Sequence, residues 1–94
     1  MLKITGGNDI RRGGVKIGWI DGNDIRNEDG KKLGYFTSND IYRADGNKLG
    51  FIIGNDLHFT SGRTIRLDDV RDKHVVGGGI SNLARCAVLI LIGH

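Results

Sequence analysis

The sequence predicts a mainly β fold of four β-hairpin repeats, about 16 residues each and related by pseudo-fourfold symmetry, completed by a C-terminal apolar helix. Three observations predict it: a phrase Asn-Asp-apolar that occurs four times, a constant spacing of turn glycines, and an apolar segment after the fourth copy. The turn glycines recur every sixteen residues, at Gly14, Gly30, Gly46 and Gly62. Because a repeat of this size cannot bury a core alone, each copy must pack against its neighbours.

The chain is expected to form a single domain over residues 1–94. Its 94 residues include 38% hydrophobic residues, which is near the lower limit for a self-sufficient core, so oligomerisation would help. Sixteen glycines in register and no proline indicate tight turns instead of a flexible linker. The expected segments are repeats at about 5–19, 20–35, 36–51 and 52–67, a charged connection at 68–76, and a glycine hinge with the apolar segment at 77–94.

Each repeat is predicted to be a hairpin. In the second copy Asp29-Gly30 lies between two runs with strand character, and Asp-Gly is a strong hairpin signal because it tolerates positive φ. The first copy is one residue shorter between Asp9 and Gly14 than the later copies, which places the deletion at a loop tip.

Side-chain alternation along the second strand of a hairpin predicts Leu33 and Tyr35 on one face, with Lys32 and Gly34 on the other. The glycine before the aromatic residue is expected to leave room for a neighbouring strand or ring, although Arg66 replaces it in the fourth copy. The aromatic position then predicts a core or axial ring made of Trp19, Tyr35, Phe51 and Leu67.

After the fourth copy the pattern changes. Val75-Val76 is a candidate short strand, and the glycines at 77–79 form a hinge. Ser81 or Asn82 is a candidate cap for a helix over residues 83–92, packed against or through the centre of the hairpins. The β-branched end of this run keeps a strand open as the alternative. A run so apolar must be buried, in the chain's own core or in a dimer contact.

The four hairpins, with their Gly/Ser-Asn-Asp-Ile and Asp-Gly-x-Lys-Leu-Gly-aromatic phrases and the apolar tail, resemble the small bacterial family described as 4-fold beta flower proteins. The resemblance covers nearly the whole chain. It implies four hairpins arranged as petals about a pseudo-fourfold axis. It carries no activity, cofactor or catalytic residue, so no functional residue is transferred from it.

A symmetric arrangement would place four aspartates in a ring that suits a hard cation such as calcium. The alternative, which we favour, is that each Asn-Asp opens a strand and pairs with nearby backbone groups or cations. No metal and no cofactor is therefore predicted. The candidate polar ring consists of Asp9, Asp24, Asp40 and Asp56.

Two residues after each aspartate, the sequence places hydrogen-bonding or stacking groups on the face away from the core. They are candidates for an outer-face binding surface, although a half-buried strand shows polar groups to solvent in any case. The lysines at 16, 32 and 48 have the same two interpretations, and they also protect strand edges. The candidate outer-face residues are Arg11, Arg26, Tyr42 and His58.

The remaining segments and residues that could bind an anion or a metal or act as a nucleophile give only weak sequence signals. The segment 77–82 offers free amides before a helix, but it lacks a P-loop ending and is interpreted as a hinge. The three histidines have no metal-ligand spacing, and Cys86 in the apolar run is predicted to be a buried, inert thiol. No catalytic residues are predicted.

The sequence therefore favours a non-enzymatic binding or assembly module, with a homo-oligomer or a protein partner. The alternatives are a ligand- or metal-binding module, enzymatic or not, with a site near the axis, and a weak nucleic-acid binder suggested by the net charge of +3. The single cysteine and the short apolar runs favour a cytoplasmic protein without a membrane segment.

Overall fold

A computed structural model describes residues 1–93 and shows a mainly β protein, with one ten-stranded mixed sheet and C-terminal helices. The last residue of the segment expected over 77–94 lies outside the described residues. In chain order the strands are β1 (Leu2–Thr5), β2 (Asp9–Arg12), β3 (Val15–Asp21), β4 (Asp24–Asn27), β5 (Lys32–Thr37), β6 (Asp40–Arg43), β7 (Lys48–Ile53), β8 (Asp56–Phe59), β9 (Thr64–Arg66) and β10 (Val75–Gly77).

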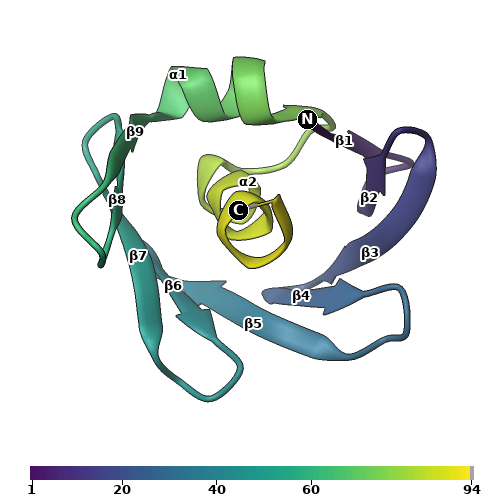
Figure 1. Cartoon of the computed structure of the whole chain (residues 1–94), viewed down its shortest axis with the longest axis horizontal. Helices are drawn as coiled ribbons and strands as arrows, with labels where there is room; N and C mark the ends of the chain where they lie inside the picture. Colours follow the sequence, from purple (N-terminus) through teal and green to yellow (C-terminus); the bar gives the residue numbers. More distant parts are fainter. Residues whose placement is uncertain (94) are drawn as a thin grey trace.

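The sheet follows the chain from β1 to β9 in consecutive antiparallel pairs, and β10 adds in parallel beside β1. The strands curve around the C-terminal helix, while α1 (Leu67–Asp69) and the π-helical turn η1 (Val70–His74) lie across the opening between β9 and β1 (Figure 1). The connection predicted to be merely charged is thus helical in its first part. The short strand predicted at Val75-Val76 is present.

Two kinds of turn alternate along the sheet. The glycine turns predicted from Asp-Gly join β4 to β5 and β6 to β7, which confirms the hairpins. Between them, two-residue turns join β3 to β4, β5 to β6 and β7 to β8, so the Gly/Ser-Asn pairs are turns as well. In the first hairpin only Gly13 and Gly14 separate the paired Arg12 and Val15, so the missing residue is at a loop tip.

The apolar tail is helical: α2 spans Asn82–Val88 and continues into the π-helical turn η2 (Leu89–Gly93). The hydroxyl of Ser81 accepts a hydrogen bond from the Ala84 amide at 3.1 Å, which confirms the predicted cap. Figure 1 shows this helix end-on at the centre of the curved sheet. Residues 84–89 are buried there, so the tail finds its apolar surroundings within its own chain.

The core lies between the inner face of the sheet and this helix. It is built on the apolar residue that follows each Asn-Asp phrase, and all four such residues are 0% exposed. Burial of these branched side chains is the main stabilising contribution expected for a domain this small. They are Ile10, Ile25, Ile41 and Leu57. Neither helical segment of residues 1–93 has the length and hydropathy that spanning a bilayer requires.

Candidate functional site

Glycine on the inner face of three strands is what admits the central helix. A Cβ at Gly34 would collide with the carbonyl oxygen of Tyr42 and would lie 2.7 Å from the methyl carbons of Leu91. The other two glycines are equally confined, with Ile92 beside Gly18 and Ile90 beside Gly50. Residues 90, 91 and 92 follow one another around the helix, and each faces a different hairpin. The glycine slot therefore accommodates the helix, besides the neighbouring strand that the sequence predicted.

A β-bulge sets which side chains face outward. In the pairing of β4 with β5, Ile25 lies opposite Gly34 and Arg26 opposite Lys32, which leaves Leu33 without a partner. The same register shift recurs in the pairs β2–β3 and β6–β7. An extra residue breaks the strict alternation of a strand. The predicted grouping of Leu33 with Tyr35 is therefore wrong, and Leu33 points inward while Lys32 points outward.

The aromatic residues consequently lie on the outer face instead of around the axis. The Lys32 amine is 4.7 Å from the ring centroid of Tyr35, and Lys16 and Lys48 cover Trp19 and Phe51 in the same way. All three rings are half-buried and none belongs to the core. The axial ring predicted from Trp19, Tyr35 and Phe51 is thus corrected, and the cause is the bulge.

Only the fourth member of that predicted ring, Leu67, is a core residue. The pair β8–β9 has no bulge, so Arg66 lies opposite Asp56, where Phe51 lies opposite Asp40 in the preceding hairpin. Arg66 therefore occupies the place of the aromatic residue. Leu67 takes the next, inward place, and the sequence alignment of the fourth copy was out of register by one residue.

The four aspartates do not form a ring. Each lies half-buried at the outward start of its strand, and the first three are paired with the lysine of their own hairpin. Within residues 1–93, no group of three or more histidine, cysteine or acidic residues is positioned to hold a metal ion. The ion pairs are Asp9–Lys16 at 3.2 Å, Asp24–Lys32 at 3.3 Å and Asp40–Lys48 at 3.0 Å, and Asp56 has Arg66 opposite.

The candidate outer-face residues are engaged within the protein. The two arginines donate hydrogen bonds of 3.0 and 2.8 Å, and the tyrosine and histidine stack on rings with centroids 5.0 and 5.2 Å away. These contacts use the groups that a ligand on this face would need. The pairs are Arg11 with Thr5, Arg26 with Gly30, Tyr42 with Tyr35 and His58 with Phe51.

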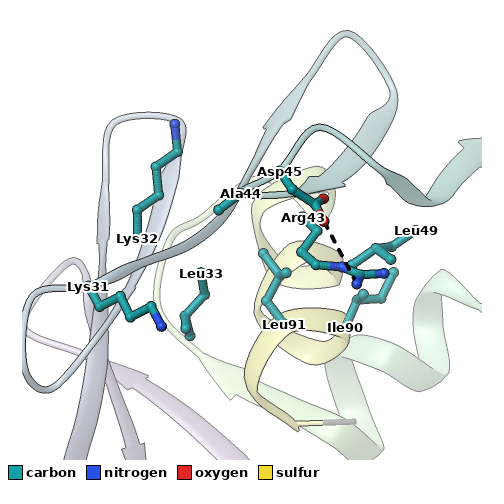
Figure 2. A pocket seen from close by; sticks show the side chains of 9 residues that line it. All are labelled: Lys31, Lys32, Leu33, Arg43, Ala44, Asp45, Leu49, Ile90 and Leu91. Atoms are coloured by element: carbon teal, nitrogen blue, oxygen red, sulfur yellow. Dashed lines mark ion pairs between the residues drawn. The ribbon is translucent and has the colours of Figure 1, made fainter.

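A concave site lies elsewhere, between the β4–β5 turn and the β6–β7 turn, next to η2. This rim pocket has a volume of about 460 Å³ (Figure 2). Such a volume is within the range of small-molecule sites, which combine an apolar wall with a few polar groups. Its floor is apolar, with Leu33, Leu49, Ile90 and Leu91, and its edge carries the charged residues Lys31, Lys32, Arg43 and Asp45 beside Ala44.

The rim pocket and the next gap along the sheet differ in one aromatic side chain. Arg43 and Phe59 are sixteen residues apart and start equivalent turns, in which their amides bond to Asn47 and Arg63 at 2.8 Å. Phe59 is 7% exposed and belongs to the core, whereas Arg43 is exposed at the mouth of the pocket. The bulged leucine, Leu33, becomes part of the floor, so the bulge contributes to the site as well.

The charged side chains at the pocket edge differ in whether an ion pair already holds them. The amine of Lys32 is held by Asp24 at 3.3 Å, and in Figure 2 it extends away from Ile90 and Leu91. Arg43 and Asp45 form an exposed pair at 3.9 Å, which is long enough to contribute little. Lys31 is exposed, and its amine lies on the side of Leu33 in Figure 2. The mouth of the pocket therefore carries an excess of positive charge.

Two buried groups of α2 are structural in character. Burial raises the pKa of the Cys86 thiol to about 12, as expected for an inert thiol. Arg85 is 6% exposed and donates to the carbonyls of Val75 and Gly77 at 2.7 and 2.8 Å. Burial lowers its pKa from the ordinary value. The hinge at 77–79 is thus tied to the helix through carbonyl oxygens, which an anion site would not use.

Sequence reasoning missed the rim pocket, and one signal was present. Comparing position 43 with position 59 shows a charged residue where the next copy has an aromatic one, which marks an unfilled place between hairpins. Comparisons with protein-family models, with curated proteins and with solved structures find no match to this chain. The function is therefore argued from the site alone.

Proposed function

We propose that this chain is a non-enzymatic binding module that takes a small, partly apolar molecule in the rim pocket. The observation that carries the proposal is the apolar floor of Leu33, Leu49, Ile90 and Leu91 under a polar edge, in a volume of about 460 Å³. Burying an apolar group there removes it from water at a gain of about 25 cal/mol per Å² of its surface. The floor belongs to two bulged strands and the central helix, so the site is preformed.

The proposed architecture behind the site is the four-petalled β flower that the sequence resembles. Support comes from a backbone hydrogen bond that recurs between equivalent atoms at 2.8 to 3.0 Å. The donors and acceptors are Ile20 to Asn8, Phe36 to Asn23, Ile52 to Asn39 and Leu67 to Asn55. The contacts of residues 90, 91 and 92 with three successive hairpins support the same arrangement, with the helix on the pseudo-fourfold axis.

Binding is favoured over catalysis because the described residues bring no acid, base and nucleophile together. The aspartates are held by lysines on separate hairpins, and the thiol of Cys86 is buried with a raised pKa. A site on the axis has no support, since the axis is occupied by α2. The homo-oligomer or protein partner and the weak nucleic-acid affinity stay predictions; the apolar tail, buried in its own sheet, no longer argues for the former.

The test uses a variant that the protein itself suggests. Arg43→Phe places in the pocket the side chain that position 59 already carries, so the variant is expected to fold and to fill the site. The measurement is the methyl NMR spectrum of both proteins during titration with octan-1-ol, a neutral apolar probe. We expect the methyl signals of Leu33, Leu49, Ile90 and Leu91 to shift in the wild-type protein only.

Arg12→Phe is the control, because Arg12 lies at the first hairpin turn and does not line the pocket. It should leave the titration unchanged. Shifts that are absent from the wild-type protein, or that persist undiminished in Arg43→Phe, would rule out the rim pocket as the site.

A further inference from the structure

We infer that the ligand of the rim pocket is an amphipathic anion: an apolar chain or ring that fills the floor and ends in one carboxylate at the mouth. This inference rests on the proposed function and adds the chemical class of the ligand. Two features carry it, namely the separation of an apolar floor from a charged edge and the identity of the charges on that edge.

The floor restricts the buried part of the ligand. Its four aliphatic side chains include no hydrogen-bonding group, so a polar atom placed among them would lose its water without a partner. Because of the bulge, the side chain of Leu33 forms part of the floor, and Leu91 of the helix lies beside it (Figure 2). The polar group of the ligand must therefore lie at the mouth.

The mouth selects the sign of that polar group. Lys31 lies at one turn and Arg43 at the next, so that two cations flank the apolar floor from different hairpins. The third cation, Lys32, is neutralised by Asp24, and the one acid, Asp45, is 3.9 Å from Arg43 in an exposed pair. A carboxylate at the mouth would accept from Lys31 and Arg43, and charge-assisted bonds of this kind are the stronger ones.

The next gap along the sheet differs from the rim pocket in two side chains. In the next gap the position of Arg43 is taken by Phe59, and Thr60 stands where Ala44 does. There the hydroxyl of Thr60 bonds to the carbonyl of Leu49 at 3.2 Å. The combination of an unfilled floor and two flanking cations therefore distinguishes the gap between the β4–β5 and β6–β7 turns from the next gap along the sheet.

The experiment compares three probes with the same eight-carbon chain at pH 7: octanoate, octan-1-ol and octylamine. Dissociation constants come from the methyl shifts of the floor residues. Exposed ion pairs contribute about 0.2–1 kcal/mol each, so two of them predict that octanoate binds about twofold to thirtyfold tighter than octan-1-ol. Octylamine is expected to bind more weakly than the alcohol.

Lys31→Gln and Arg43→Gln should each reduce the affinity for octanoate severalfold, while the affinity for octan-1-ol stays the same. Lys16→Gln is the matched control, since Lys16 is a lysine of another hairpin that pairs with Asp9 and does not line the pocket, and it should leave the preference intact. Equal binding of acid and alcohol, or tighter binding of the amine, would overturn the inference and leave the rim pocket as a neutral apolar site. Absence of binding by all three probes would instead defeat the proposed function.

Discussion

Ser38 shows how a single residue can be held in a conformation that it disfavours. Its φ of 58° is the only positive value found for a non-glycine residue among residues 1–93, and the equivalent turns use Gly22 and Gly54 with φ of 61° and 59°. A two-residue hairpin turn with positive φ at its first position normally takes glycine. Serine at this place therefore stores strain.

Ser38→Gly is accordingly expected to stabilise the protein, by about 1 kcal/mol. The relief of strain, about 1–3 kcal/mol, exceeds the loss of about 0.5–1 kcal/mol that glycine brings through its greater freedom in the unfolded chain. Urea denaturation gives the free energy of unfolding. Ser61→Gly is the control, since Ser61 lacks positive φ and its replacement should be neutral or destabilising. A loss of stability in Ser38→Gly would contradict the assigned turn geometry.

At the same scale, the sequence predicted the structure correctly wherever the local conformation requires a particular residue type. The Asp-Gly turns, the Ser81 cap and the burial of Cys86 follow from φ preference, hydrogen bonding and hydropathy, and the structure shows each of them. The sequence did not predict that the side chain of Tyr35 points outward. This orientation depends on the register shift between β4 and β5 that leaves Leu33 unpaired, and no single residue of the sequence indicates such a shift. The rim pocket depends in turn on the same bulge.

At the scale of elements, the packing of η2 against the sheet rests on the three inward glycines. Gly34→Ala introduces a Cβ that meets a backbone carbonyl of β6 as well as Leu91, and only the side chain can move aside. We expect a loss of about 1–3 kcal/mol in the free energy of unfolding, as for other overpacked cores. Thermal denaturation followed by circular dichroism measures it.

Gly79→Ala provides the matched control for this substitution. Gly79 has no heavy atom within 4 Å of a Cβ position and no positive φ, so its replacement should have little effect. If Gly34→Ala were as stable as the control, the helix could not lie against β5 as described.

Elements also explain why the helix at 83–92 was left open between two interpretations. Its β-branched end is unusual for a helix, and periodicity alone does not separate a buried helix from a buried strand. Inside the sheet, apolar side chains are needed on every side, and a helix can present them all round while satisfying its own backbone. Tertiary surroundings thus decide the conformation, whereas the local sequence predicts only burial.

For the whole molecule, the buried thiol of Cys86 makes the free energy of unfolding vary with pH in the alkaline range. Its pKa is raised from 9.0 to about 12 by burial, so between these values the unfolded chain has lost the proton that the folded protein still holds. Stability is therefore complete below pH 9 and falls as pH rises, by about 1.4 kcal/mol per pH unit from this group. A comparison with Cys86→Ala isolates the contribution of the thiol.

The measurement is the free energy of unfolding of both proteins between pH 8 and about 11. Cys86→Ala is expected to be less stable near neutral pH, through the loss of buried volume, but to show a shallower decline above pH 9. Parallel declines in the two proteins would mean that the thiol titrates normally in the folded state. The mainly β fold of repeated hairpins was predicted from repetition; the addition of β10 beside β1 and the helical segment across the opening of the sheet were not.

The placement of the helix in the middle of the sheet has a consequence for the order of folding. The core residues of β2, β4, β6 and β8 all face a segment that is synthesised after them, and β1 pairs with β10 across more than seventy residues of chain. Contacts so distant in sequence form slowly, because the chain loses the entropy of closing a long loop before the contacts can stabilise it. During synthesis the inner faces of the hairpins therefore stay uncovered until residues 82–92 have also been made, because only this helix covers them.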